Sequence, residues 1–294
     1  TGGLPGEYKH PRGADITLVV EVPPSRGDGK PLVVPDSIEL QYRLAGGRGS
    51  GRAYLSRMGD RQFKHSISRL QDSMEFWIKG GDFANRVPYR VIVVDPPRVD
   101  SIVLDNLYPE YTGLNTIDDG RRVPDEKLVL GTQVSVPLET ELLLNVTANK
   151  PIVSARILAS AFELDLSAEA ATLTLFTEEG TSQSTVPIAD SLAGQMSFAG
   201  GGPVSTFTVP FFVTGRARAI LADKQLLADQ LSDAAPHPGI PLPSDMPLQI
   251  SLVDADEITG LDPARLTITG IPDKPPSIET RLRGVSSMIT RKAV

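Results

Sequence analysis

Apolar and polar residues alternate over many short stretches of this chain, and the alternation predicts β-strands. In the stretch 38–44, Ile38, Leu40, Tyr42 and Leu44 occupy every second position, and polar side chains lie between them. A period of two places the apolar side chains on one face of a strand and the polar ones on the other. About seven such strands in the first hundred residues are typical of an immunoglobulin-like (Ig-like) antiparallel β-sandwich.

A proline pair follows two of these strands in nearly the same setting. Pro96-Pro97 comes after the apolar run 89–94, and Pro275-Pro276 comes after the run 264–271. Proline cannot donate a hydrogen bond to a sheet, and it restrains the preceding residue to an extended conformation. Each pair therefore predicts the end of a domain and a stiff, polyproline-like link to whatever follows.

These two boundaries divide the chain into three parts. Residues 1–97 are expected to form one Ig-like β-sandwich, and residues 98–276 an enlarged one. Residues 277–294 are interpreted as the start of a truncated following unit or a tail. The fold class is thus all-β, with tandem Ig-like sandwiches joined by Pro-Pro linkers.

The second part is long for one sandwich of about 100 residues, and the excess has a visible location. Separate strands are predicted at 140–148 and 153–159, and a further strand at 205–213. An insertion is expected near 214–247, ending in a proline-rich loop. Its middle has leucines at helical spacing and predicts a short helix, the residues being Leu226, Leu227 and Leu231.

Composition narrows the functional classes. The chain of 294 residues has a net charge of −7, which disfavours a nucleic-acid-binding protein, and it has no cysteine, which removes disulfides and thiolate chemistry. No apolar run reaches the length of a membrane helix, and no signal peptide is visible. Because the sequence opens on Thr1, it is interpreted as an excerpt from a longer protein.

One acidic cluster is a candidate metal site. Asp254, Asp256 and Glu257 follow an apolar run, and carboxylates at alternating loop positions can supply oxygen ligands to Ca²⁺. The spacing of an EF-hand is missing, and the alternative is a solvated turn after a strand. No nucleophile elbow, phosphate-binding loop or dinucleotide motif occurs, so no catalytic residue and no cofactor is predicted.

Two further features are interpreted either as interaction sites or as ordinary solvated loops. Arg43, Arg48 and Arg52 flank one predicted hairpin loop and are either a grip for an anionic partner or a solvated loop. The tripeptide Arg26-Gly27-Asp28 matches an adhesion motif but is more typical of a β-turn in such a glycine-rich loop. A row of exposed aromatic side chains on one sandwich face would favour carbohydrate binding instead.

The stretch 89–115 carries a resemblance to a known group of proteins. A strand ends in the proline pair, a second strand follows, and then comes the phrase Tyr108-Pro109-x-Tyr111-Thr112-Gly113-Leu114. This phrase, the stretch 131–157 and the stretch 250–278 resemble the Ig-like repeats of large uncharacterised envelope proteins of planctomycete-type bacteria. The resemblance covers roughly residues 14–280 and implies tandem sandwiches outside the cytoplasm, with no catalytic residues to transfer.

The function expected from these observations is that of a non-enzymatic structural or protein-interaction module in a larger extracytoplasmic, cell-envelope protein. Its partners are expected to be neighbouring domains of the same polypeptide or another envelope protein, without nucleic acid and without insertion of this segment into a membrane. The alternative is a carbohydrate-binding or adhesive β-sandwich module.

Overall fold

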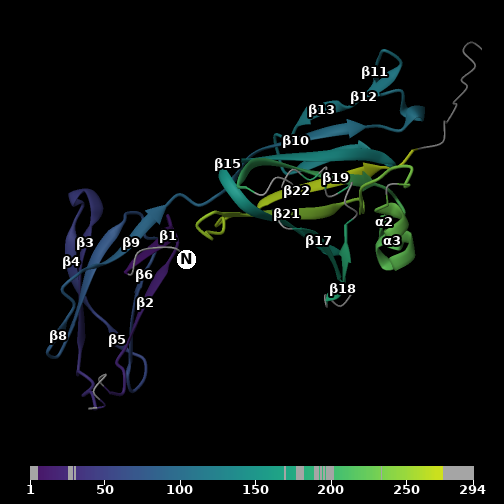
Figure 1. Cartoon of the computed structure of the whole chain (residues 1–294). Coiled ribbons are helices and arrows are strands. Elements are labelled where there is room, and N and C mark those ends of the chain that lie inside the picture. Colours follow the sequence, from purple (N-terminus) through teal and green to yellow (C-terminus); the bar gives the residue numbers. More distant parts are fainter. Residues whose placement is uncertain are drawn as a thin grey trace, which may run out of the picture.

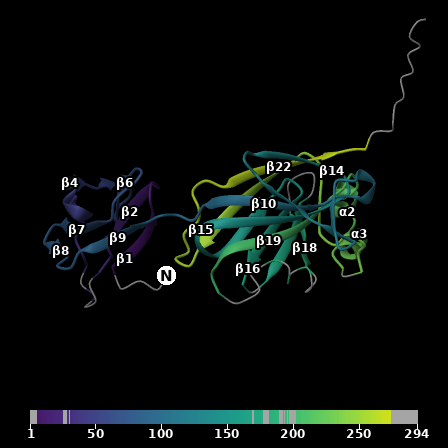
Figure 2. The ribbon, with the colours of Figure 1, turned by 90° about the horizontal axis from the view of Figure 1, so that it is seen from above.

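The chain folds into two β-sandwich units joined in tandem, as a computed structural model shows (Figure 1, Figure 2). The structure describes residues 6–25, 29, 31–168, 170–176, 182–188, 192, 194, 196, 202–232 and 234–273. The tripeptide Arg26-Gly27-Asp28, the second proline pair and the stretch 277–294 lie outside the described residues. The prediction of an all-β chain of tandem Ig-like sandwiches is confirmed.

The N-terminal unit contains nine strands and one short 3-10 helix within the described residues. In chain order they are β1 (Glu7–Pro11), β2 (Ile16–Glu21), β3 (Ile38–Leu44), η1 (Ala45–Gly47), β4 (Ser50–Tyr54), β5 (Ser56–Arg57), β6 (Gln62–Ile67), β7 (Met74–Gly80), β8 (Phe83–Ala84) and β9 (Tyr89–Val94).

These strands form two facing sheets in the order of an Ig-like domain. One sheet has the order β1-β9-β7-β3-β4, with β8 beside β7, and the other has the order β2-β6-β5. The order β9-β7-β3-β4 corresponds to G-F-C-C′ and the order β2-β6-β5 to B-E-D of Ig-like domains, with β1 added beside β9. The alternating apolar residues of β3, β7 and β6 meet between the sheets, where Leu40, Met74 and Phe63 are buried.

The C-terminal unit is larger. Its elements are β10 (Val99–Leu107), η2 (Glu110–Thr112), β11 (Thr116–Asp118), β12 (Arg121–Val123), β13 (Asp125–Leu128), β14 (Gln133–Pro137), β15 (Thr140–Leu158), β16 (Phe162–Ser167), β17 (Ala171–Phe176), β18 (Ser182–Pro187), β19 (Val204–Val213), α2 (Ala217–Ala222), α3 (Lys224–Gln230), β20 (Ile240–Leu242), β21 (Met246–Asp254) and β22 (Ala264–Ile271).

Eleven strands of this unit are connected by pairing, and β15 joins the two sheets that they form, β13-β10-β15-β19-β20 and β14-β22-β21-β15-β16-β17-β18. The first half of β15 lies between β10 and β19, and its second half lies between β21 and β16. The register shifts between Thr147 and Ile152, and again before Ser154, so the strand bends there and passes from one sheet to the other. The sequence predicted two separate strands here. The structure instead shows one continuous strand of 19 residues, with Pro151 at the exposed bend.

Between β19 and β21 the chain forms α2 and α3 and then β20, which returns to the sheet as a parallel partner of β19. Leu227 and Leu231 of the predicted helix are buried in the main core, whereas Leu226 is exposed. Asp223 caps α3, because its carboxylate accepts hydrogen bonds from the backbone N–H groups of Gln225 and Leu226. The segment is thus packed onto the C-terminal unit and contributes to its core.

Each unit has its own hydrophobic core. The cluster between the sheets of the N-terminal unit runs from Ile16 to Val93, and the cluster of the C-terminal unit runs from Ile102 to Ile268. The two clusters share no residue, so apolar burial does not connect the units. What connects them is the linker and the polar contacts around it.

Separate cores lead to the first prediction. Residues 1–97 should fold in isolation, because all strands of the N-terminal sandwich and its whole core lie within them. Trp77, the only tryptophan, should report a cooperative melt within roughly ten degrees of the first transition of the whole chain. Fluorescence melting of the fragment checks this, and an unfolded fragment would show that the units depend on one another.

Candidate functional site

The junction between the two units contains a network of polar contacts between residues far apart in the sequence. The linker residues after β9 run past the bend of β15, and Asn149 in that bend holds them. The Asn149 side chain accepts from the backbone N–H of Arg98 at 2.9 Å and donates to the carbonyl of Pro96 at 3.4 Å. The Asn149 N–H also donates to the carbonyl of Arg98. The C-terminal unit therefore grips the linker backbone directly.

Lys150, the next residue of the bend, joins the linker to a buried carboxylate. Its Nζ donates to the carbonyl of Asp95 at 3.0 Å and to Oδ2 of Asp254 at 2.6 Å. The Lys150 side chain is partly shielded, and that of Asp254 is almost completely buried. A buried ion pair of this kind is sensitive to removal of one partner, because the other charge is then left without compensation.

Asp254 is the last residue of β21 and organises the turn that follows. Its Oδ1 accepts from the backbone N–H groups of Asp256 and Ile258 at 2.9 and 3.0 Å. Burial alone would raise the pKa of the Asp254 carboxyl, but the hydrogen bonds from Lys150, Ile258 and Asp256 outweigh it and hold the pKa below its usual range. The carboxylate is therefore ionised and accepts three hydrogen bonds.

The other two residues of the acidic cluster point to different surroundings. Asp256 forms an ion pair with Lys9 of β1, which is a contact between the two units. Glu257 takes a left-handed backbone conformation, with φ of 62°, within the turn. Among the described residues, no three His, Asp or Glu side chains form a group that could hold a metal ion.

The solvated-turn interpretation of this cluster is wrong for Asp254, which is 1% exposed. Its position at the end of an apolar strand gave no sign of burial, because the partner Lys150 lies 104 residues away in the sequence. Asp254, Asp256 and Glu257 stay a candidate calcium site, at which we expect no calcium to bind. Competing with it is the ion pair with Lys150, which already occupies one oxygen of Asp254.

On the side of the N-terminal unit, Arg12 supports the start of the linker. Its Nε donates to Oδ1 of Asp95 at 2.6 Å, and another guanidinium nitrogen donates to the carbonyl of Gln71. The hydrogen bond from Arg12, followed by its charge, lowers the pKa of the Asp95 carboxyl. Both side chains are largely exposed, so this pair contributes little to stability and mainly fixes direction.

A glycine allows the two backbones to approach. A Cβ atom built on Gly260, in the turn after β21, would lie 2.5 Å from the carbonyl oxygen of Pro97. No side chain can be placed there unless the linker moves, because the obstructing atom belongs to the backbone. Gly260, Asn149, Lys150 and Lys9 are the junction residues that the sequence did not reveal.

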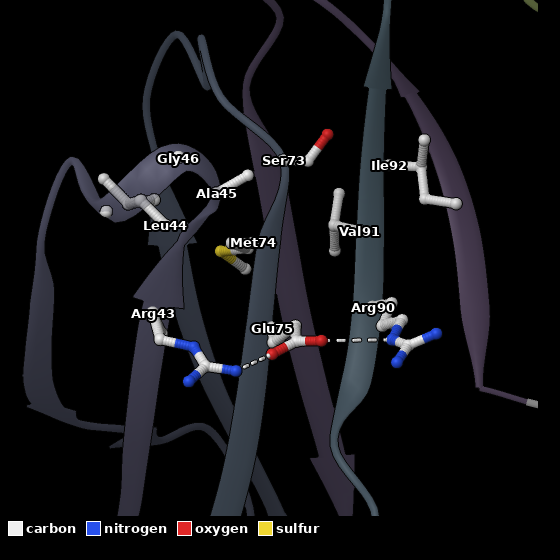
Figure 3. Close-up of a pocket in the computed structure, with 11 residues that line it drawn as sticks. Arg43, Leu44, Ala45, Gly46, Ser73, Met74, Glu75, Arg90, Val91 and Ile92 are labelled. Carbon is white, nitrogen blue, oxygen red and sulfur yellow. Dashed lines mark hydrogen bonds and ion pairs between the residues drawn. The ribbon is translucent and has the colours of Figure 1, made fainter.

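A second candidate site is a hollow of about 530 Å³ on the N-terminal unit (Figure 3). Arg43 and Arg90, on β3 and β9, lie on either side of Glu75 on β7, and both donate to its carboxylate, at 2.5 and 3.2 Å. The hydrogen bond from Arg43 is the largest cause that lowers the Glu75 pKa. Arg90 also pairs with Glu7 of β1, so the row of charges crosses four strands.

The three arginines of the predicted hairpin loop therefore all have acidic partners. Arg43 pairs with Glu75, and the remaining two pairs are Arg48 with Asp72 and Arg52 with Glu39. The cluster does not present an uncompensated positive charge to an anionic partner.

The outer face of the same sheet bears on the carbohydrate alternative. Trp77 is only partly exposed, and the guanidinium of Arg43 lies 5.9 Å from its ring centroid. Tyr54 is exposed but belongs to β4, which is separated from β7 by β3. This described face carries alternating charges and two separate aromatic side chains, so it does not form a row of stacked sugar platforms.

Comparison with known proteins gives no family. No protein-family model matches the sequence, and no curated protein matches it either. Among solved structures, the I9-I11 tandem from titin is 8% identical with a TM-score of 0.26, over 90% of this chain and 63% of that chain. The titin domains Z1Z2 in complex with telethonin are 10% identical with a TM-score of 0.21, over 91% and 93%. The Ig-like assignment rests on the strand order of the chain itself.

The helices of the described part of the chain are short, and none of them is long and apolar enough to cross a membrane.

Removing the lysine of the buried pair gives the second prediction. Lys150→Met should lower the free energy of unfolding of the C-terminal unit by about 3 kcal/mol, the lower end for a broken buried pair, because Asp254 keeps its backbone donors. Urea unfolding measures this, and Lys224→Met, at an exposed position on α3, should change it little. Equal effects of the two substitutions would contradict the role given to Lys150.

The same variant has a predictable pH dependence. The folded-state pKa of Asp254 is lowered, so the stability it contributes is present above the unfolded value near 3.8 and is lost as the pH falls through the folded value. The difference in unfolding free energy between the wild type and Lys150→Met should therefore shrink below about pH 4. Denaturant titrations at several pH values check this, and a difference that grows on acidification would refute it.

For the acidic cluster we expect no increase in melting temperature at millimolar Ca²⁺. A ligand that binds only the folded state would raise the melting temperature with its concentration. A rise of several degrees that is abolished by Asp256→Ala would overturn this expectation and establish a calcium site.

Proposed function

We propose that this chain is a non-enzymatic structural and protein-interaction module whose role is to hold two Ig-like units at a defined angle. The observation that carries the proposal is the grip of Asn149 and Lys150 on the linker backbone. A flexible tether would need no such contacts, whereas a spacer that sets direction depends on them.

The contacts differ in strength, and their arrangement matters more than their sum. The exposed pairs Arg12–Asp95 and Lys9–Asp256 are each of a kind that contributes about 0–1 kcal/mol. Asp95 directly precedes two consecutive prolines, which limit the linker to extended conformations. Gly260 then lets the turn after β21 lie directly against the linker. Together these constraints oppose both bending and twisting between the units.

The domain boundaries belong to the same proposal. We place the first unit at residues 1–97 and the second at 98–276, with 277–294 as the start of a following unit or a tail. In this arrangement the second proline pair has the role of the first, which is to direct the next part of a longer polypeptide.

The cellular setting is proposed from the sequence resemblance. The Ig-like repeats that resemble residues 14–280 belong to bacterial envelope proteins, which supports an extracytoplasmic place, in the periplasm or cell envelope. The partners are then neighbouring domains or another envelope protein. The carbohydrate-binding or adhesive alternative has less support, because Trp77 lies partly under Arg43 and the exposed Tyr54 is two strands away.

Gly260→Ala tests the spacer function. The added methyl group must displace the linker, so the distribution of distances between the units should broaden or shift, while each unit melts within about 0.5 kcal/mol of the wild type. The distance is measured between spin labels at Ser56→Cys in the N-terminal unit and Ser135→Cys in the C-terminal unit, both exposed positions. Because the chain has no other cysteine, the labels attach only there, in the wild-type background and in each variant.

Gly131→Ala is the matched control, because a Cβ there has no atom within 4 Å. It should leave the distance distribution unchanged. A wild type with a broad distribution that Gly260→Ala does not alter would show that the junction is a tether and would refute the proposed function.

A further inference from the structure

Another hollow of the N-terminal unit opens between the edges of its two sheets. It has a volume of about 480 Å³ and is lined by β1, β7 and β9 of one sheet and by β2 of the other. Strands β1 and β2 are the outermost strands of their sheets, and among the described strands β1 pairs only with β9 and β2 only with β6. No described strand therefore closes the sandwich on this side. We call this hollow the edge cavity.

Two tyrosines in the edge cavity face the inside of the sandwich and are nevertheless exposed. Tyr89 precedes the buried Val91 by two positions on β9, and Tyr8 is the parallel partner of Val91 on β1, so all three side chains share one face of the sheet. Val91 is 2% exposed, whereas Tyr8 is 54% and Tyr89 is 42% exposed. The opposite sheet normally covers side chains on this face, so the two rings indicate a space that a ligand can fill.

The lining of the edge cavity is rich in aromatic rings. Phe76 of β7 stacks on Tyr89 with ring centroids 5.3 Å apart, and the ring of Tyr8 lies 6.1 Å from that of His10. On the side of the other sheet, the buried Ile16 of β2 lines the cavity. Aromatic rings pair favourably in stacked and tilted arrangements at such distances. A concave, largely apolar space of this volume is the usual form of a small-molecule site.

One buried polar atom of the lining has no partner. His10 is 5% exposed, and its Nε2 lies 3.2 Å from the carbonyl oxygen of Ala14, whereas its Nδ1 has no hydrogen-bond partner. A carbonyl oxygen only accepts, so Nε2 carries the hydrogen, and in that tautomer Nδ1 is an acceptor. A buried acceptor without a donor is costly. A ligand that brings an N–H or O–H group to His10 removes this cost.

The charged groups of the lining favour a neutral ligand. Glu7 pairs with Arg90, and the carboxylate of Asp15 accepts from the backbone N–H of Arg69 at 2.8 Å. These groups already have partners, so none of them is left to compensate the charge of an ionic ligand.

We propose that the edge cavity binds a small, neutral aromatic molecule that carries one hydrogen-bond donor, of the type of indole or phenol. The ring lies against Tyr8 and Tyr89, and the donor meets Nδ1 of His10. The cavity belongs to the N-terminal unit alone, so this inference goes beyond the spacer function and does not depend on the junction.

Indole and 1-methylindole test the proposal, because they share one ring system and only indole can donate. In NMR titrations of the whole chain, indole should bind with a Kd on the order of 100 µM, as suits a ligand of its size. We expect 1-methylindole to bind about tenfold more weakly, because it leaves Nδ1 unpaired. His10→Leu should weaken the binding of indole about tenfold and leave that of 1-methylindole unchanged, which also shows that the cavity is intact.

Tyr89→Ala removes one wall of the cavity and should weaken the binding of both ligands about tenfold. Tyr54→Ala is the matched control, since Tyr54 is 68% exposed on β4, at the opposite edge of the same sheet, and it should change neither. The proposal is wrong if millimolar indole causes no saturable shifts, or if the wild type binds the two ligands equally. It is equally wrong if Tyr89→Ala behaves like Tyr54→Ala.

Discussion

The bend in β15 is the constraint on which the rest of the C-terminal unit and the junction depend. Before the bend the even-numbered residues of the strand are buried, and after it Ala155 and Ile157 are buried instead. A bulge shifts the alternation by one position, so the same strand presents apolar side chains to one core from two different sheets. The two sheets are thus covalently continuous through a single strand. At the bend itself, Asn149 and Lys150 have left the regular ladders and are available to the linker.

The two units share one strand arrangement at their C-terminal strands, and it explains why the proline-pair motif occurs twice. In the first unit β1 runs parallel to β9, with Pro11 paired to Val94, and in the second β14 runs parallel to β22, with Pro137 paired to Ile271. In both pairs the next backbone N–H, of Arg12 or of Leu138, donates to the carbonyl of the last strand residue. In each unit the final strand is thus paired along its edge with a parallel strand, and the proline pair follows in the sequence. The proline-pair motif recurs in the sequence because both units end on a strand of the same kind.

The sequence revealed what is local and missed what is distant. Period-two alternation placed the strands, since the side chains that define it are neighbours, and leucine spacing located α3. The continuity of β15 was hidden because Asn149, Lys150 and Pro151 look like a turn between two strands. The burial of Asp254 depends on Lys150, which the fold brings near from far along the chain. Tyr108 and Tyr111 stand in one short phrase of the sequence, yet only Tyr108 is buried.

The geometry of the junction also separates contacts that form within the C-terminal unit from contacts that form between the units. The pair Lys150–Asp254 lies within the C-terminal unit, so folding of that unit alone shapes the turn that carries Asp256 and Gly260. Only then can Asp256 meet Lys9 and Gly260 meet the carbonyl of Pro97. Contacts within the unit are shielded from solvent, whereas the pair between units is exposed and is weakened by salt. The C-terminal unit therefore prepares a rigid surface, and the N-terminal unit is oriented by weaker contacts on it. The angle between the units is thus set by contacts on which neither fold depends.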